Sequence, residues 1–75
     1  AIPFSLARAA AVSLRVYDLT GRVAATLFDG SLPSGEHLVR WDGTRDGGAR
    51  VPPGAYFYEL RCSGERLQRR LILLR

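Results

Sequence analysis

The sequence predicts an all-β fold, an antiparallel β-sandwich of about seven short strands. Side chains alternate between the two faces of a strand, so a strand with one buried face shows an apolar residue at every second position. Val12, Leu14 and Val16 show this alternation most clearly. Glycine and proline separate the alternating segments, above all within residues 43–54, where they fit no strand interior. Short strands at close spacing with turn residues between them are typical of an antiparallel sandwich, and no segment requires a helix.

The first half of the chain contains three expected strands. Residues 1–7 alternate weakly, and Pro3 lacks a backbone donor, so this segment is expected to be an edge or first strand. Residues 11–19 and 22–29 form the second and third strands. A turn containing glycine links these two strands so closely that they should pair as a hairpin.

The second half contains the rest of the predicted strands. Residues 36–42 form a strand that includes Trp41, and residues 50–51 form one short strand. Residues 55–62 form a long strand, and residues 66–74 form the last strand after a tight turn. These segments complete the two layers of a sandwich.

Residues of matching parity on successive strands are expected to share one core. On the third strand, the inward residues should be Val23, Ala25 and Leu27. On the strand expected over 55–62, Glu59 has the parity opposite to that of Tyr58 and should face outward. The residues expected to be mostly buried are Val12, Leu14, Val16, Val39, Trp41, Tyr56, Tyr58 and Leu60. Of these, Trp41, Tyr56 and Tyr58 are the expected structural core around the glycine- and proline-rich crossing.

Size and composition limit the function. Seventy-five residues, of which 47% are hydrophobic, form one domain over 1–75 with a modest core. The single cysteine excludes an internal disulfide and a multi-cysteine metal site. Methionine is absent, so we expect the chain to be a piece of a longer protein. No run of about 18 apolar residues exists that would span a membrane as a helix.

The net charge of +4 comes from arginine alone, because lysine is absent. Genome composition explains exclusive arginine use more simply than a ligand does. A basic excess permits contact with a polyanion but does not establish it. The arginines are spread over every strand rather than gathered with aromatic residues, so we expect no nucleic-acid partner.

No residue cluster indicates catalysis, a metal or a cofactor. Residues 42–47, DGTRDG, faintly resemble a calcium loop but lack its alternate oxygen ligands and distal Glu, and Asp before Gly is common turn chemistry. His37 shares a strand face with Val39 and is expected to be a packed strand residue rather than a base. Cys62 is expected to be a small core residue rather than a reactive thiol. We therefore expect no enzymatic activity.

Aromatic residues leave a binding module open as an alternative. Tyr17 and Phe57 could stack against a ligand, and Trp41 could bind a sugar, if their rings were exposed. Inward parity favours a structural role for Trp41. Exposure of these three rings therefore decides whether a carbohydrate-binding function is tenable.

The last strand is the candidate recognition segment. It is rich in arginine, which discourages edge-to-edge pairing, but Ile72 and Leu74 make its outer face apolar as well. Such an end must pack on both sides or present a patch to a partner. The expected recognition segment consists of Arg69, Arg70, Leu71, Ile72, Leu73, Leu74 and Arg75.

Three short pieces, in this order and spacing, carry a family resemblance: YDLTGR at 17–22, WDG at 41–43 and GAYFY at 54–58. With them, nearly the whole chain resembles the immunoglobulin-like domain of the flagellar hook-capping protein. It is also similar to the C-terminal sorting domains of type IX secretion, although Arg69, Arg70 and Arg75 stand where sorting domains often carry Lys. The resemblance implies an immunoglobulin-like or fibronectin III-like sandwich.

The resemblance also implies a noncatalytic C-terminal module of a larger secreted or surface protein in bacteria, exported through the periplasm and serving export sorting or attachment. Its partners would then be the secretion or surface-attachment machinery, or neighbouring domains of the parent protein. A structural spacer or an assembly domain, as in the hook cap, is the alternative function. The isolated domain is expected to be monomeric.

Overall fold

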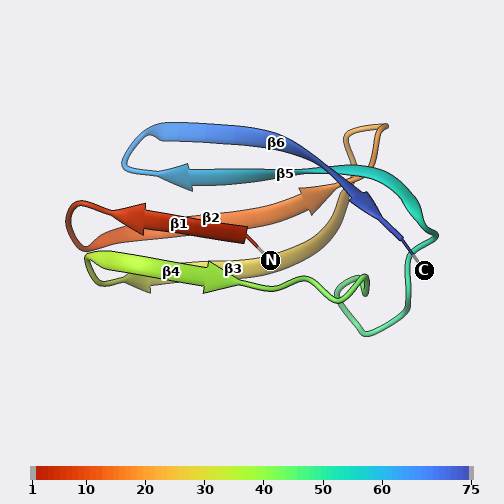
Figure 1. Ribbon diagram of the computed structural model, residues 1–75, viewed down its shortest axis with the longest axis horizontal. Coiled ribbons are helices and arrows are strands. Elements are labelled where there is room, and N and C mark those ends of the chain that lie inside the picture. The colour runs from red at the N-terminus through yellow and green to blue at the C-terminus, as the bar shows by residue number, and fades with distance from the viewer. Residues whose placement is uncertain (1, 75) are drawn as a thin grey trace.

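Two antiparallel sheets of unequal size make up the computed structural model, which describes residues 2–74 (Figure 1). The larger sheet has the strand order β3-β2-β5-β6, and the smaller sheet pairs β1 with β4. The strands are β1 (Ile2–Leu6), β2 (Ala10–Tyr17), β3 (Val23–Leu32), β4 (Gly35–Val39), β5 (Gly54–Cys62) and β6 (Glu65–Leu73). The predicted all-β sandwich is therefore confirmed, with six strands over the described residues.

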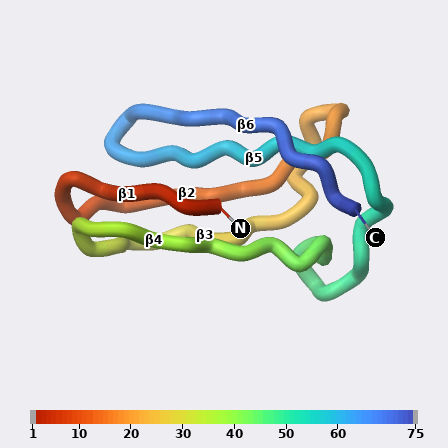
Figure 2. Tube along the Cα trace, in the orientation of Figure 1, coloured from red at the N-terminus to blue at the C-terminus, as the bar shows by residue number. Residues whose placement is uncertain are grey.

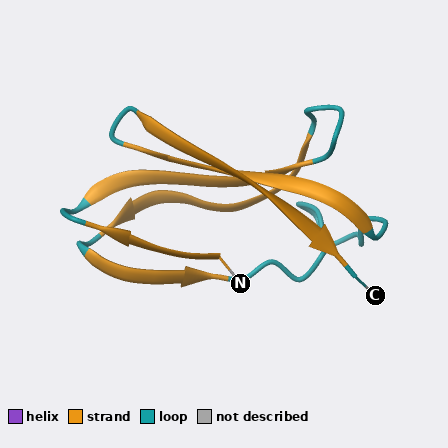
Figure 3. Ribbon diagram, turned by 45° about the horizontal axis from the view of Figure 1, so that its top comes forward, coloured by secondary structure: helices purple, strands orange, loops and turns teal. Residues whose placement is uncertain are grey.

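The smaller sheet covers only part of the larger one. Figures 1 and 2 show β1 and β4 in front of β2 and β3, whereas neither of these two strands lies in front of β5 or the first half of β6. The turned view separates the same two layers (Figure 3). One face of the large sheet is thus covered unevenly, and this governs the burial described below.

The predicted hairpin of the second and third strands is confirmed as β2 and β3. Its turn is organised by Asp18, whose Oδ1 accepts hydrogen bonds from the backbone N–H groups of Thr20 at 2.9 Å and Arg22 at 3.1 Å. Gly21 adopts a φ of 90°, in the left-handed region where a side chain is disfavoured. Gly21 thus lies in the turn that was predicted, whereas Asp18, which the strand expected over 11–19 included, belongs to the turn as well.

Two irregularities in the β2–β3 pairing overturn the expected parity of β3. The register shifts after Leu14 and again after Val16, so β3 contributes an extra residue at each place. An extra residue on one strand reverses which side chains face the core. Ala24 and Ala25 are consequently both buried, at 8% and 2% exposure, while Val23 is 50% exposed. The expectation that Val23 faces inward was wrong.

The segment between β4 and β5 differs from the prediction as well. The strand expected over 36–42 ends at Val39, which leaves Trp41 in irregular structure. The strand expected at 50–51 is only an isolated bridge between Thr44 and Arg50. Gly47 and Gly48 both adopt a φ of 97°, which no strand accommodates. These predicted bounds were wrong because the turn residues occupy more of the chain than the alternation suggested.

The core lies between β2 and the smaller sheet. It continues toward the irregular segment between β4 and β5, residues 40–53, which is called the crossing segment below. Val12, Leu14 and Val16 are at most 2% exposed. Val39, Trp41, Tyr58 and Leu60 are only partly buried, in contrast to the expectation that they are mostly buried. One core cluster consists of Val16, Ala24, Ala25, Val51 and Tyr56, with Leu27, Trp41, Tyr58, Leu71 and Leu73 packed against it.

Candidate protein-docking strand

β6 forms one edge of the large sheet. It pairs with β5 in an unbroken antiparallel register from Gly54↔Leu73 to Cys62↔Glu65. Within residues 2–74, no strand pairs with its other edge. An open strand edge offers backbone donors and acceptors to another chain, unless charge or proline prevents pairing.

The two halves of β6 differ in burial. Residues 65–70 are exposed, including Leu67 at 40%. Leu71 and Leu73 are partly buried and pack against the core cluster. Ile72 is 57% exposed on the opposite face, and Leu74 beyond the strand is 81% exposed. The structure thus gives the predicted recognition segment an apolar outer surface at its C-terminal end, while Arg75 lies outside the described residues.

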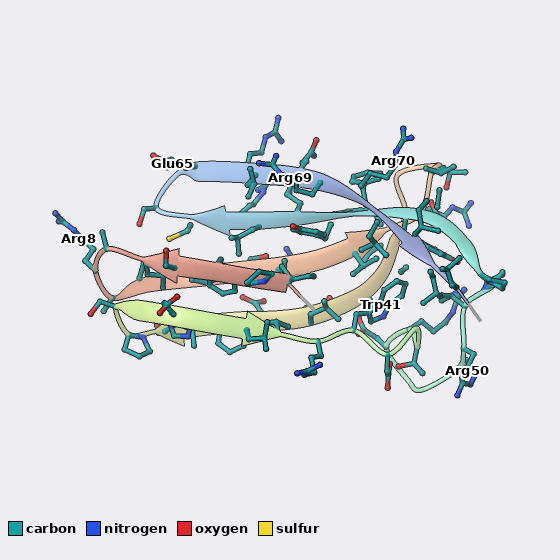
Figure 4. The ribbon with its side chains drawn as sticks, viewed as in Figure 1. Arg8, Trp41, Arg50, Glu65, Arg69 and Arg70 are labelled. Carbon is teal, nitrogen blue, oxygen red and sulfur yellow. The ribbon has the colours of Figure 1, made fainter. Side chains whose placement is uncertain are left out.

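Arg69 and Arg70 project to opposite faces of the sheet. Arg70 is paired with Phe57 and lies on the outer face, whereas Arg69 is paired with Tyr58 on the face toward the smaller sheet. Both are exposed, and Figure 4 labels them on β6. Arg69 Nη1 donates to the carbonyl of its neighbour Gln68 at 3.1 Å. One binding surface would therefore contact one of these arginines more readily than both.

Glu59 ties β5 to β6 on the outer face. Its carboxylate accepts hydrogen bonds from Arg61 Nε at 2.8 Å and Gln68 Nε2 at 2.9 Å, and Arg66 Nη1 lies 3.6 Å from it. Burial raises the pKa of Glu59, but the hydrogen bonds from Gln68 and Arg61 and the charges of Arg61 and Arg66 outweigh it and lower the pKa overall.

Glu59 was expected to be an ordinary outward residue, yet it is only 6% exposed. Arg61 faces Arg66 directly across the strand pair, an arrangement of like charges that needs an acid nearby. The pairing of Arg61 with Arg66 indicates the role of Glu59, but it can be recognised only once the register of β5 and β6 is known.

The outer face also carries an apolar row at the other end of the sheet. The register aligns Val23, Tyr17, Phe57 and Arg70 side by side. The Tyr17 and Phe57 rings are stacked, with centroids 5.4 Å apart and planes inclined by 15°. Both residues are partly buried, and each ring presents one of its two faces to the other.

Trp41 is held in place by the protein. Its Nε1–H donates to the carbonyl of Thr44 at 2.8 Å, and its ring meets Tyr56 edge-on at a centroid distance of 5.3 Å. Tyr56 in turn donates its hydroxyl hydrogen to the carbonyl of Pro52. Figure 4 shows Trp41 beside the crossing segment. These contacts use the polar edge of the indole internally and support packing rather than sugar recognition.

The acidic residues of the crossing segment organise turns. Asp42 Oδ1 accepts from the N–H and hydroxyl of Thr44 at 3.0 and 2.6 Å, and the hydroxyl bond, followed by the backbone bond, lowers the Asp42 pKa. Asp46 Oδ1 accepts from the backbone N–H of Thr26 at 3.0 Å and so fastens the crossing to β3. No group of three or more His, Cys, Asp or Glu side chains in residues 2–74 is arranged to hold a metal ion.

The remaining candidates for chemistry have local structural contacts. His37 Nε2 lies 2.8 Å from the carbonyl of Pro33, and its ring lies 5.4 Å from that of Phe4. Cys62 is partly buried, with its sulfur 3.7 Å from Ser63 Oγ. Over the same described part of the chain, no helix is long and apolar enough to cross a membrane.

Comparison with known proteins identifies a family. The family model of the FlgD Ig-like domain matches residues 1–65. No curated protein and no solved structure matches the chain. The family match ends where β6 begins, so Arg69–Leu74 lies beyond it. Because the match covers most of the chain and the fold is the expected sandwich, the chain belongs to the FlgD Ig-like domain family.

Proposed function

We propose that this domain is a noncatalytic assembly module of an exported bacterial protein, and that β6 is its docking strand. Membership of the FlgD Ig-like family indicates a structural or assembly domain. The observation that carries the proposal is the C-terminal end of β6, where Ile72 and Leu74 are 57% and 81% exposed on an open sheet edge beside Arg70. Exposed apolar residues with a charged rim are typical of protein-binding surfaces.

The partner is either the secretion or surface-attachment machinery or a neighbouring domain of the parent protein. The resemblance to type IX sorting domains favours the machinery, since those domains are read at their C-termini. Arg70 would orient the partner through an acidic side chain, while Ile72 and Leu74 would lose their contact with water on binding. The domain itself would act outside the cell or at its surface.

A structural spacer is the second candidate function. The extent of the family match favours it, because residues 1–65 are recognised without most of β6. A spacer would need β6 only to close the sheet. The docking function therefore needs the exposed side chains at the end of β6, whereas the spacer function does not.

The test compares two double variants of the parent protein. Arg70→Glu with Ile72→Thr changes the proposed docking surface and leaves the inward residues Leu71 and Leu73 intact. Arg40→Glu with Leu38→Thr, exposed positions outside β6, is the matched control. Delivery of the parent to the cell surface is measured by protease accessibility, and folding is checked by the melting temperature of the isolated domain.

The docking function predicts that the β6 variant is delivered poorly at an unchanged melting temperature, while the control is delivered normally. Normal delivery of both variants would exclude these side chains from recognition. If deletion of the whole domain also left delivery unchanged, the domain would be a spacer.

A further inference from the structure

The face of the large sheet that looks toward β1 and β4 is progressively uncovered from β2 to β6. The register places Leu14, Leu60 and Leu67 side by side in one row across β2, β5 and β6. Leu14 is fully buried, Leu60 is partly buried, and Leu67 is 40% exposed. A sheet normally buries its apolar face against a second layer. Here the second layer stops before it reaches β6.

The neighbouring rows repeat this gradient. Val12 is 2% exposed, its partner Cys62 is partly buried, and Glu65 beyond it is exposed. Val16, Tyr58 and Arg69 form the row on the other side, again from fully buried to exposed. Because Glu65 and Arg69 are charged, their exposure also follows from their own chemistry, and Leu67 is the apolar β6 residue of these three rows that stays exposed.

β1 borders the uncovered strip with an open backbone edge. It pairs with β4 from Ile2↔Val39 to Leu6↔Gly35, and within residues 2–74 its other edge has no partner strand. Figure 1 shows that this other edge is the one nearer to β5 and β6. A strand added there would extend the smaller sheet to three strands and lie over the uncovered leucines.

A groove occupies this location. Its volume is about 690 Å³, and it runs between the end of β1 with the following turn and the inner face of the β5–β6 hairpin. Its apolar floor comes from Leu60, Cys62 and Leu67, and its opposite wall from Leu6 and Ala7. An open strand edge beside an apolar floor is the arrangement that binds an extended peptide by strand addition.

The charges at the groove favour an acidic peptide. The charged residues that line the groove are Arg8 on the β1–β2 turn and Glu65 and Arg66 at the start of β6. Arg69 lies farther along β6 (Figure 4). Arg66 lies 3.6 Å from the Glu59 carboxylate, whereas no ion pair joins Arg8 or Glu65 to another residue of 2–74. Two arginines against one glutamate leave a positive rim. Complementary charge at a rim adds specificity and speeds association.

We propose that this groove binds an extended segment of a partner protein, with apolar residues at alternate positions and at least one acidic residue between them. The segment adds a strand to the free edge of β1 over residues 4–6, because Pro3 has no backbone N–H to donate, and lays its apolar side chains on Leu60 and Leu67. This surface is separate from the outer face of β6 and does not depend on β6 being a docking strand. A helix would leave the backbone groups of β1 without partners, so an extended segment fits better.

The probe is a fluorescein-labelled ten-residue peptide in which valine alternates with threonine and glutamate. One control peptide has lysine in place of each glutamate, and another has the same composition without the alternation. Binding to the folded domain is followed by fluorescence anisotropy. The alternating acidic peptide should bind at least about tenfold more tightly than either control. Equal binding of all three peptides would overturn the proposal.

Cys62 reports directly on whether the peptide occupies the groove. As the single cysteine, it lines the groove floor, and its reaction with DTNB is followed by absorbance. Saturating acidic peptide should slow this reaction severalfold, because the thiol would be covered. A peptide that binds without changing the rate would occupy another surface and contradict the proposed site.

Paired leucine substitutions distinguish peptide binding in the groove from nonspecific binding to exposed apolar residues. Leu67→Glu places a charge on the groove floor, and Leu38→Glu places one at a 55% exposed position on the outer side of the smaller sheet. Leu67→Glu should weaken binding of the acidic peptide by about tenfold or more, while Leu38→Glu should stay within about twofold of the parent chain. Similar effects of both substitutions would overturn the assignment.

A second copy of the chain is the competing occupant. Sedimentation equilibrium of the unmodified domain and of its Leu67→Glu variant distinguishes self-association from binding of a separate partner. The proposal predicts that both are monomeric in the absence of peptide. A dimer of the parent chain that Leu67→Glu abolishes would show that the groove serves self-association, and would overturn recognition of a separate partner.

Discussion

β2 and β6 belong to the same sheet and both place leucine on the face toward the smaller sheet, yet these leucines differ in burial. Val12, Leu14 and Val16 on β2 are at most 2% exposed, whereas Leu67 on β6 is 40% exposed and residues 65–70 are all exposed. On β6 the matching positions are Glu65, Leu67 and Arg69, of which only Leu67 is apolar, and the covering layer lies over β2 and not over the start of β6. Alternation thus decides which face a side chain takes, and the opposite layer decides whether that face is buried.

The far end of β6 refines this comparison. Leu71 and Leu73 pack against a cluster that includes Val51, and Trp41 packs against the same cluster. The irregular segment between β4 and β5 therefore supplies the cover there that a strand supplies over β2. The smaller sheet covers β2, and the segment between β4 and β5 covers the C-terminal end of β6. The first half of β6 is covered by neither.

Alanine substitution of one leucine on each strand gives the largest expected difference. Leu14→Ala removes a fully buried side chain and should lower the free energy of unfolding by about 3–4 kcal/mol, a large part of the stability of a small domain. Leu67→Ala removes a side chain that is 40% exposed and should cost less than about 1 kcal/mol. Urea unfolding of both variants measures the difference. Equal losses would mean that β6 is covered as β2 is.

Removal of the tryptophan ring tests the irregular cover. Trp41 is partly buried but bonded to Thr44, so Trp41→Ala should cost about 2–3 kcal/mol, less than for a fully buried ring. Trp41→Phe keeps an aromatic ring but loses the hydrogen bond, and should cost about half as much. Thermal unfolding followed by circular dichroism compares the two. An unchanged melting temperature of Trp41→Ala would show that this segment does not support the core.

Removal of the Glu59 carboxylate, which joins β5 to β6, should have a moderate effect on the free energy of unfolding. Glu59→Gln removes the charge that Arg61 and Arg66 share and should cost about 1–2 kcal/mol at neutral pH, because both arginines remain largely solvated. Asp29→Asn, which breaks a 3.6 Å pair between Asp29 and Arg15 at a more exposed carboxylate, is the control and should change stability by less than about 0.5 kcal/mol.

The same residue predicts a pH dependence. The folded state lowers the pKa of Glu59, so its contribution to stability is present above the unfolded pKa and is lost as the pH falls toward the folded pKa. The difference in stability between the parent chain and Glu59→Gln should therefore shrink as the pH falls below about 4. A difference that stays constant down to acidic pH would contradict a role for the ionised carboxylate.

The smallest expected effect on stability is at Arg70. Its side chain is exposed and makes no ion pair within the described residues, so Arg70→Glu should change the free energy of unfolding by less than about 0.5 kcal/mol. Chemical denaturation of the isolated domain measures this. A larger loss would indicate that Arg70 supports the sheet, and its use as a docking residue would then be harder to separate from folding.

Local sequence patterns predicted much of the fold, because strand alternation and turn chemistry are local properties. The hairpin of β2 and β3, with Gly21 in its turn, follows directly from them, although the expected strand extended past Asp18. The inversion of Val23 could not be predicted, because a bulge depends on the partner strand. The burial of Glu59 likewise depends on which residues β6 brings opposite it.

The candidate surfaces were predicted less completely. The apolar C-terminal end of β6 was visible as Ile72 and Leu74 break the polar alternation. The groove beside β1 was not visible, because no pattern along one strand shows where an opposite sheet ends. Cys62 was expected to be a core residue, yet it lines this groove at partial burial. Only the three-dimensional arrangement brings it next to Leu6 and Leu67.

The uneven covering of the large sheet is tested most directly by NMR of the leucine methyl groups in the presence of a soluble paramagnetic agent. Leu14, Leu60 and Leu67 form one row, so a single experiment reads the cover across three strands. The structure predicts negligible relaxation enhancement at Leu14, an intermediate value at Leu60 and a strong one at Leu67. Equal protection of Leu67 and Leu14 would show that a layer covers β6, and would contradict both the comparison and the groove.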